Sequence, residues 1–276
     1  MSATLGFLGT GTIASAMVTG LRAAGEDTPA ILLSPRNASA AAALAARFEN
    51  VSVAASNQEV VDQAETIVVA VRPQIARDVL AALRFPARAN VVSLVSGLPV
   101  RRLAELTAPA TRISRAVPLP SAARRMSPTP VFPRDPEVVD LFARLGSAIA
   151  VEEEARFDAL CVITATMAAY FTFAGTSAEW LTRQGVNPEQ ARDYVAQIHK
   201  GLALTAADSP SVSFADLAAD HATRGGTNEQ VVGYLKQHGV FARLDEALDA
   251  ILRRVTGSAA TGRNPSAGGD LPRSVS

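Results

Sequence analysis

The chain has 276 residues, of which 26 are basic and 26 acidic, so its formal net charge at neutral pH is zero. Without an excess of positive charge, it lacks the electrostatic basis for binding a phosphate backbone or an anionic membrane, and we expect no nucleic-acid partner. Hydrophobic residues make up 48% of the chain, which excludes disorder for most of it, and the length favours two domains.

Metal and membrane signals are also weak. Cys161 is the single cysteine, so the chain cannot form an internal disulfide or a multi-thiolate metal site, and the histidines show no ligand spacing. The N-terminus has no basic region before an apolar run, and no apolar stretch approaches the ~20 residues that cross a bilayer. We therefore expect no metal, no membrane partner and a cytoplasmic location.

Residues 1–151 alternate short, continuously apolar runs with alanine-rich helical stretches, which is typical of βαβ units around a parallel sheet. The predicted strands occupy residues 5–8, 31–33, 51–53, 66–71 and 91–94. The predicted helices occupy residues 13–24, 39–48, 59–64, 75–83 and 100–106. Two further extended segments, 112–117 and 148–151, flank a proline-rich connection, 118–136, that cannot be a regular helix. The pattern predicts an α/β domain with a doubly wound parallel sheet.

The strand signal disappears from Glu152 onward, so residues 152–256 are predicted to form a second, all-α domain. Its helical segments are residues 152–184, 188–207 and 228–256, with interruptions at Gly185, Pro210 and Gly239. The first segment exceeds the mean helix length of about 11–12 residues, which indicates packing against a partner chain and therefore a homodimer. Residues 257–276 carry almost no apolar side chains and are predicted to be disordered.

The first predicted strand leads into the pattern Gly-x-Gly-x-x-Ala at Gly9, Gly11 and Ala14. Gly9 permits a tight turn, Gly11 lets the backbone approach a pyrophosphate, and Ala14 keeps the helix close to the sheet. Because the pattern follows a strand and opens a helix, we interpret it as the dinucleotide site of a Rossmann-type domain. The candidate cofactor contacts here are Gly9, Thr10, Gly11, Thr12 and Ile13.

The residues after the second strand favour NADP. An NAD site usually has an acidic residue there, whereas this chain has Ser34 and Arg36, which can bind a 2′-phosphate. Asn57, after the third strand, can cap its helix and can also contact a ribose. The remaining candidate cofactor contacts lie at the ends of the fourth and fifth strands: Ala70, Val71, Arg72, Pro73 and Ser96.

With these motifs in this order, the sequence resembles the pyrroline-5-carboxylate reductase family over nearly its whole length, to about Val255. The segment from Ala70 to Pro73 stands where the family has Ala-Val-Lys-Pro, and residues 115–118 stand where it has Arg-x-Met-Pro. Residues 164–170 replace the family's Gly-Ser-Gly-Pro-Ala-Tyr, and residues 223–228 replace its Ser-Pro-Gly-Gly-Ala/Thr-Thr.

The resemblance implies NADPH as cofactor, a small cyclic imino acid as substrate, and a helical domain that dimerises by interleaving. It places the substrate between the nicotinamide and the loop at Gly225 and Gly226, whose backbone amides are suited to hold a substrate carboxylate. The candidate substrate contacts are Thr223, Arg224, Gly225, Gly226 and Met167. A homodimer or larger homo-oligomer is the expected assembly.

The departures from the family fall in the substrate site. Asn228 replaces the threonine that hydrogen-bonds the imine nitrogen, and Thr227, one position earlier, keeps a hydroxyl; these two are the candidate catalytic residues. Arg224 replaces a proline, and either pairs with a substrate carboxylate or is merely solvated. We therefore expect an imine reductase, and leave open whether pyrroline-5-carboxylate is its preferred substrate.

Two other functions stay open. The β-hydroxyacid dehydrogenases share this layout, but they use a lysine early in the first long helix of the second domain. The chain has lysines only at Lys200 and Lys236, so residues 152–184 supply none. A protein that binds NADP without turnover is the second alternative, which the replacement at Asn228 keeps open.

Overall fold

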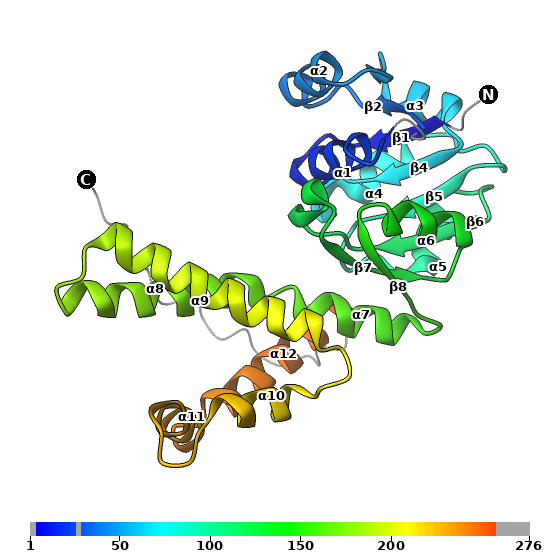
Figure 1. Ribbon diagram of the computed structural model, residues 1–276. Coiled ribbons are helices and arrows are strands. Elements are labelled where there is room, and N and C mark those ends of the chain that lie inside the picture. The colour runs from blue at the N-terminus through cyan, green and yellow to red at the C-terminus, as the bar shows by residue number, and fades with distance from the viewer. Residues whose placement is uncertain (1–3, 26–28, 258–276) are drawn as a thin grey trace.

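The computed structural model describes residues 4–25 and 29–257, so the predicted tail beyond Gly257 lies outside the described residues. The N-terminal domain is built on an eight-stranded sheet in the order β3-β2-β1-β4-β5-β6-β7-β8 (Figure 1). Neighbouring strands are parallel except β6 and β7. The strands are β1 Thr4–Leu8, β2 Ala30–Leu33, β3 Val51–Val53, β4 Thr66–Val69, β5 Asn90–Ser93, β6 Arg112–Ala116, β7 Ser127–Phe132 and β8 Gly146–Ala150. The predicted doubly wound, Rossmann-type sheet is confirmed.

Helices cover both faces of this sheet because its strands are apolar on both sides. The helices are α1 Thr12–Arg22, α2 Ala38–Arg47, α3 Asn57–Gln63, α4 Pro73–Ala81, α5 Val100–Leu106 and α6 Pro136–Ala143. One core cluster unites the sheet with α1, α2 and α6, and the other unites it with α3, α4 and α5. The first five strands and the first five helices agree with the sequence prediction to within two residues at each end.

The sequence analysis missed three elements between β6 and β8. The short 3₁₀ helix Pro120–Arg124 and β7 lie within the proline-rich connection, and α6 begins at its last residue. Pro128 and Pro130 lie two residues apart in β7, so the N–H groups that they lack would both face β6. Pro130 still offers its carbonyl oxygen to the N–H of Val117, 3.4 Å away. The antiparallel pairing of β6 with β7 is correspondingly short, and β7 is held mainly by its parallel ladder with β8.

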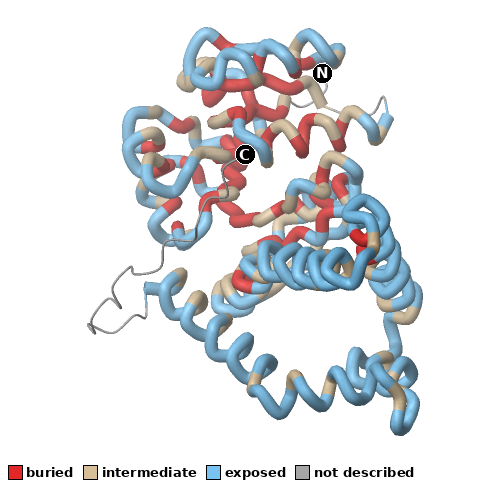
Figure 2. The backbone as a smooth tube through the Cα atoms, turned by 90° about the vertical axis from the view of Figure 1, so that its left-hand side faces the viewer, coloured by how far each residue is buried: buried red, intermediate tan, exposed pale blue. Residues whose placement is uncertain are grey.

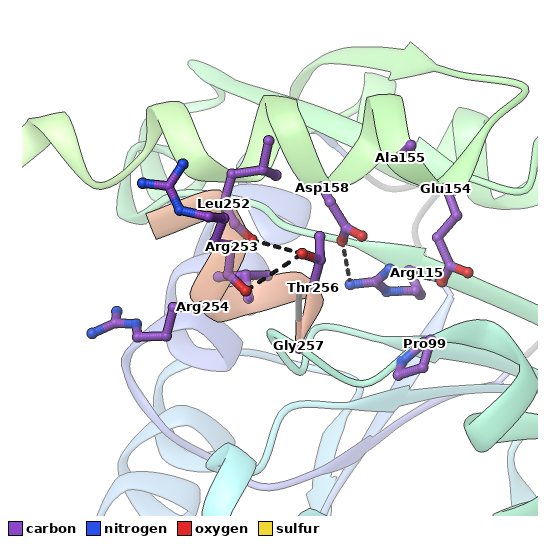
Figure 3. A pocket seen from close by; sticks show the side chains of 12 residues that line it. Pro99, Arg115, Glu154, Ala155, Asp158, Leu252, Arg253, Arg254, Thr256 and Gly257 are labelled. Atoms are coloured by element: carbon purple, nitrogen blue, oxygen red, sulfur yellow. Dashed lines mark hydrogen bonds and ion pairs between the residues drawn. The ribbon is translucent and has the colours of Figure 1, made fainter. Parts of the chain in front are cut away.

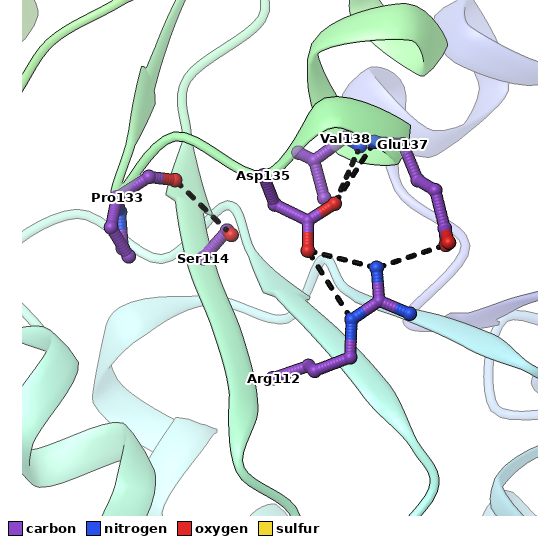
Figure 4. A network of polar contacts seen from close by, with 6 residues as sticks. All are labelled: Arg112, Ser114, Pro133, Asp135, Glu137 and Val138. Atoms are coloured by element: carbon purple, nitrogen blue, oxygen red, sulfur yellow. Dashed lines mark hydrogen bonds and ion pairs between the residues drawn. The ribbon is translucent and has the colours of Figure 1, made fainter.

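Asp135 marks the start of α6 (Figure 4). Its Oδ1 accepts hydrogen bonds from the N–H groups of Glu137 and Val138, at 3.0 and 3.2 Å, and Pro136 follows as the first helical residue. Its other oxygen lies 2.8 Å from Nη2 of Arg112, which also pairs with Glu137 at 3.0 Å. The hydrogen bond to Asp135, followed by that to Glu137, raises the pKa of Arg112 above its usual value.

The C-terminal domain contains only helices among the described residues, as predicted. They are α7 Glu154–Ile163, α8 Thr166–Arg183, α9 Pro188–Asp208, α10 Phe214–His221, α11 Thr227–Gln237 and α12 Val240–Thr256. The predicted helix over 152–184 is divided by a turn at Thr164 and Ala165. The predicted interruption of 228–256 at Gly239 is confirmed, since φ there is +67° and α12 begins at the next residue. The sequence analysis did not predict α10.

The helical domain buries few of its own apolar side chains (Figure 2). Phe171 and Phe173 on α8 are 71% and 57% exposed, and Trp180 is 54% exposed. The stretch Glu154–Arg183 is long and apolar enough to cross a membrane by length and composition alone. An 18-residue window within it has a mean hydropathy of 1.5, and 17% of that window is buried. The expectation that no such stretch exists is therefore wrong. The segment has no long unbroken apolar run, because small and hydroxyl-bearing residues lie between the apolar ones, but its mean hydropathy is still high.

Candidate active site

The glycine turn joins β1 to α1 at the sheet edge where the parallel strands β4 and β5 also end (Figure 1). Gly9 has a φ of +100°, and a Cβ added there would lie 2.7 Å from the carbonyl oxygen of Ala70. A side chain therefore does not fit between the turn and the end of β4. At Gly11 the situation is opposite, because nothing in the described chain lies within 4 Å of an added Cβ. The space beside Gly11 is open to a ligand.

The start of α1 is suited to an anion. Its N-cap residue, Gly11, has no side chain with which to cap the first turn, and that turn contains no acidic residue. Backbone N–H groups at the positive end of a helix dipole favour a negatively charged group such as a phosphate. Thr12 is exposed here, Ile13 is half-buried, and Thr10 is buried beneath the turn.

Ser34 has a structural role that the sequence analysis did not foresee. It is 1% exposed, and its hydroxyl oxygen accepts a hydrogen bond from the N–H of Gly9 over 2.8 Å. The hydroxyl of Thr10 donates to the carbonyl oxygen of Ser34, and the side-chain amide of Asn37 donates to that of Thr10. These bonds hold the glycine turn against β2. The predicted donation from Ser34 to a 2′-phosphate is not supported, because so deeply buried a side chain does not reach an external ligand.

Arg36 and Asn57 line the same hollow, of about 590 Å³, beside α3 and α4. Arg36 is exposed in the loop after β2. The N-cap of α3 is Ser56, whose hydroxyl accepts from the N–H of Glu59 over 3.1 Å, so the predicted capping by Asn57 is wrong. Asn57 is the first residue of the helix and lines the hollow with Arg36. Arg36 and Asn57, predicted to contact the 2′-phosphate and the ribose, thus share one concavity, whereas Ser34 does not line it.

The ends of β4 and β5 complete this edge of the sheet. The N–H of Ala70 donates to the carbonyl oxygen of Leu8 over 2.8 Å, which continues the β1–β4 ladder into the turn. Arg72 is exposed as the N-cap residue of α4. Pro73 and Ser96 line a second hollow of about 390 Å³. The structure therefore brings the predicted cofactor residues from five strand ends to one edge.

The Gly225–Gly226 loop lies between α10 and α11 and has a bonding pattern of its own. Gly225 has a φ of +74°, and its N–H donates to Oε2 of Glu229 over 2.6 Å. The N–H of Gly226 donates to the carbonyl oxygen of Thr223 over 2.8 Å. The side-chain amide of Asn228 donates to the carbonyl oxygen of His221 over 2.9 Å. Both glycine N–H groups are thus bonded within the chain.

The two halves of the predicted site are not together in one chain. α11 lies at the far end of the helical domain from the sheet in Figure 1, and Figure 2 agrees. The candidate catalytic residues Thr227 and Asn228 are exposed there, as is Arg224. Met167, at the start of α8, is 42% exposed. The Gly225–Gly226 loop and the start of α11 therefore do not lie against the glycine turn of their own chain.

Glu229 is a residue of interest that the sequence analysis missed. It is the third residue of α11, the position from which a glutamate side chain reaches back over the start of its helix. That spacing was readable in the sequence, because an acidic residue three positions after the Gly-Gly pair fits the pattern.

The sequence analysis named Arg115 only within the family resemblance and did not predict it as a site residue (Figure 3). It is 3% exposed at the end of β6 and lies on the wall of a hollow of about 790 Å³ between the two domains. Its Nη1 is 2.7 Å from Oε1 of Glu154, and its Nη2 is 2.9 Å from Oδ1 of Asp158. Its guanidinium carbon lies 4.5 Å from the centre of the Phe157 ring. Glu154 also accepts from the N–H of Val100, so it joins α7 to both β6 and α5.

Cys161 is half-buried on α7. Burial raises the pKa of its thiol to about 12, with a smaller raising effect from Asp158 and an opposing one from Arg115. The thiol is therefore protonated at neutral pH and is a poor nucleophile. Within residues 4–25 and 29–257, no group of three or more His, Cys, Asp or Glu side chains is arranged to hold a metal ion.

Comparison with known proteins divides the chain in the same way as its fold. Residues 4–97 match the family described as NADP oxidoreductase coenzyme F420-dependent. Residues 154–257 match the family described as pyrroline-5-carboxylate reductase dimerisation. The two matches cover the glycine turn and the Gly225–Gly226 loop respectively.

Whole-length similarity joins the two parts. The chain is 27% identical to pyrroline-5-carboxylate reductase of Pseudomonas aeruginosa over 262 residues, 91% of this chain and 94% of the relative. It shares its fold with a reductase of that name from Streptococcus pyogenes, with a TM-score of 0.80, 24% identity and coverage of 92% and 98%. The NADP-bound pyrroline carboxylate reductase of Plasmodium falciparum has a TM-score of 0.78, 19% identity and coverage of 94% and 98%.

Proposed function

Because the chain is a divergent member of the pyrroline-5-carboxylate reductase family, we propose that it uses NADPH to reduce the carbon–nitrogen double bond of a cyclic imine. The observation that carries this proposal is the similarity to these reductases over 91% of the chain. That similarity includes both the nucleotide-binding turn and the helical domain in one continuous match. We place the activity in the cytoplasm, a reducing compartment that suits a chain with one cysteine.

The residues at the sheet edge fit a dinucleotide. The open space beside Gly11 and the uncapped start of α1 suit a pyrophosphate, and the hollow that Arg36 and Asn57 share suits the phosphorylated ribose. NADPH, when bound there, supplies the hydride for the reduction. The protein's contribution is then to fix the imine carbon beside the nicotinamide and to keep water out, since positioning lowers the barrier to transfer.

A second copy of the chain is needed to complete the site. The Gly225–Gly226 loop is distant from the glycine turn of its own chain. In the same helical domain, α8 exposes large apolar side chains such as Phe171 and Trp180. Large apolar side chains exposed along one helix are typical of an interaction surface. We therefore propose that a homodimer buries the exposed face of Glu154–Arg183 and brings the loop of one copy to the nucleotide of the other.

Thr227 and Asn228 are the polar side chains of this loop that we propose to face the imine. The hydroxyl of Thr227 can donate a hydrogen bond to the imine nitrogen. The amide of Asn228 can do so with its second N–H, because its one hydrogen bond among the described residues goes to the carbonyl of His221.

NADPH oxidation against a panel of five- and six-membered cyclic imines tests the proposal. We expect turnover of at least one imine, with a homodimer as the active species in light-scattering measurements. NADPH binding without turnover of any imine or ketone would contradict it and favour a non-catalytic NADP-binding protein. Oxidation of a β-hydroxyacid with NADP⁺ in preference to imine reduction would favour the dehydrogenase alternative.

Arg36 is expected to select NADPH over NADH. Replacing it with alanine should raise the KM for NADPH about 10- to 100-fold, because a hydrogen-bonded contact with a charged group is worth about 1.5–3 kcal/mol. The KM for NADH should change less than about threefold, since NADH lacks the 2′-phosphate. Steady-state kinetics with both nucleotides measures the difference.

Arg47→Ala is the matched control, because Arg47 is an exposed arginine of the neighbouring helix α2 that packs on Phe48. It should leave both KM values unchanged. If Arg36→Ala raised the KM for NADPH and the KM for NADH by the same factor, Arg36 would not be the residue that binds the 2′-phosphate.

A further inference from the structure

The loop that is expected to receive the substrate already holds a carboxylate. Oε2 of Glu229 lies 2.6 Å from the backbone nitrogen of Gly225, and that N–H donates to it. This contact is a charge-assisted hydrogen bond of the kind that a substrate carboxylate would make with the same amide. The chain therefore supplies from its own sequence the anionic group that the loop was expected to accept from a ligand.

The backbone leaves no alternative glycine amide for a second carboxylate. The N–H of Gly226 is directed to the carbonyl oxygen of Thr223, 2.8 Å away, so it turns back into the loop. The positive φ of Gly225 directs its own N–H toward the third residue of α11, which is Glu229. A carboxylated ligand would have to displace Glu229 or bind beside it at the first turn of α11, which has no side-chain cap, and so lie close to the Glu229 carboxylate.

The charge of Glu229 is not neutralised within the loop. Arg224, which precedes Gly225 in the sequence, is exposed, and no ion pair joins it to Glu229 in the part of the chain that the structure describes. A carboxylate that entered the loop would therefore meet a like charge at close range, whereas a protonated cyclic imine would meet an opposite one.

We propose that Glu229 determines substrate specificity by occupying the carboxylate position, so that the enzyme prefers cyclic imines without a carboxylate group. The inference rests on the proposed function and narrows its substrate class. The ligand that fits is a five- or six-membered cyclic imine with hydrogen or alkyl substituents, which binds as an iminium cation. Glu229 then acts by repelling carboxylated analogues and by attracting the cation.

Competition between two substrates tests the role of Glu229. For the wild-type enzyme with NADPH, we expect a higher kcat/KM for 2-methyl-1-pyrroline than for 1-pyrroline-5-carboxylate. Glu229→Gln should raise kcat/KM for the carboxylated imine by about 10- to 100-fold relative to the uncharged one. That range lies between the limits that Coulomb's law gives for two unit charges about 4 Å apart in water and near a protein surface. The glutamine oxygen still accepts from Gly225, which preserves the loop.

Glu65→Gln is the matched control, because Glu65 is exposed just before β4, at the opposite edge of the sheet from the site. It removes the same charge and should leave the substrate ratio unchanged. Circular dichroism and light scattering on all three proteins verify that fold and assembly are preserved.

Binding to the NADP⁺-loaded protein gives a readout that does not need turnover. In calorimetric titrations, pyrrolidine should bind the wild type more tightly than pyrrolidine-2-carboxylate, and Glu229→Gln should reduce this difference at least tenfold. The inference would be overturned if the wild type bound pyrrolidine-2-carboxylate as tightly as pyrrolidine, or more tightly. It would also be overturned if Glu229→Gln changed the ratio of the two dissociation constants by less than twofold. If no imine of either class is reduced, the proposed function fails, and the binding experiment alone decides the role of Glu229.

Discussion

Replacing Gly11 with valine is expected to weaken NADPH binding at least about 100-fold while leaving the ligand-free protein folded. An added Cβ at this position meets no atom of the described chain within 4 Å, so the valine side chain projects into the space assigned to the pyrophosphate. Each charge-assisted hydrogen bond lost there is worth about 1.5–3 kcal/mol, and each 1.4 kcal/mol is tenfold in affinity. Fluorescence titration with NADPH measures the loss.

The thermal unfolding midpoint of the ligand-free Gly11→Val protein should stay within a few degrees of the wild type. Gly11 has a φ of −96°, which valine adopts without strain, and a changed N-cap residue costs about 1 kcal/mol. Gly9→Ala is the contrasting variant, because its φ of +100° and the 2.7 Å approach to Ala70 oxygen predict loss of stability without any ligand. A Gly11→Val protein that binds NADPH normally would contradict the assignment of the turn.

Replacing Arg115 with leucine is expected to lower the free energy of unfolding by about 3–5 kcal/mol. Arg115 is buried between Glu154 and Asp158, with ion-pair distances of 2.7 and 2.9 Å, and its removal leaves two carboxylates without a cation. Breaking a buried pair by deleting one partner is costly because the remaining charge stays desolvated. The corresponding fall in the unfolding midpoint is roughly 6–20 °C, measurable by differential scanning calorimetry.

Arg112→Leu provides the control, because Arg112 also pairs with two carboxylates, Asp135 and Glu137, but is 43% exposed (Figure 4). Solvent screens such a pair, so the expected loss is about 1 kcal/mol or less. Adding Glu154→Gln and Asp158→Asn to Arg115→Leu should recover part of the stability, since the unpaired charges are then removed. If Arg112→Leu and Arg115→Leu destabilise the protein equally, burial of the Arg115 network is not what matters.

Much of the N-terminal domain followed from local sequence. Strands buried on both faces read as continuous apolar runs, and Gly9 and Gly11 have the spacing that a strand–turn–helix requires, so each element could be located without reference to the rest of the chain. The helix α6 was also readable, because Asp135 and Pro136 form a standard helix start, although the sequence analysis missed it. The sequence analysis missed β7 because it contains Pro128 and Pro130. The strand tolerates these prolines because the N–H groups that they lack would face β6, which makes only a short pairing with β7.

The candidate site was predictable only in part, because side-chain roles depend on partners distant in the sequence. Ser34 has a hydroxyl of the kind that binds phosphate, but it is buried, and its oxygen accepts a hydrogen bond from the N–H of Gly9, 25 residues away in the sequence. Glu229 is an ordinary helix-start residue until the loop geometry places it on the amide of Gly225. In the same way, the pairing of Arg115 with Glu154 across 39 residues follows from domain packing and from no local pattern.

The sequence alone determined the fold class, the position of the glycine turn and the helical character of residues 152–256, because hydrophobic periodicity and glycine spacing act over a few residues. Only the tertiary structure decided which polar groups are exposed to a ligand and which are bonded within the chain. It also separated the Gly225–Gly226 loop from the glycine turn of the same chain. Such relations depend on long-range packing, which fixes the distance and burial of each group only when the whole chain is folded.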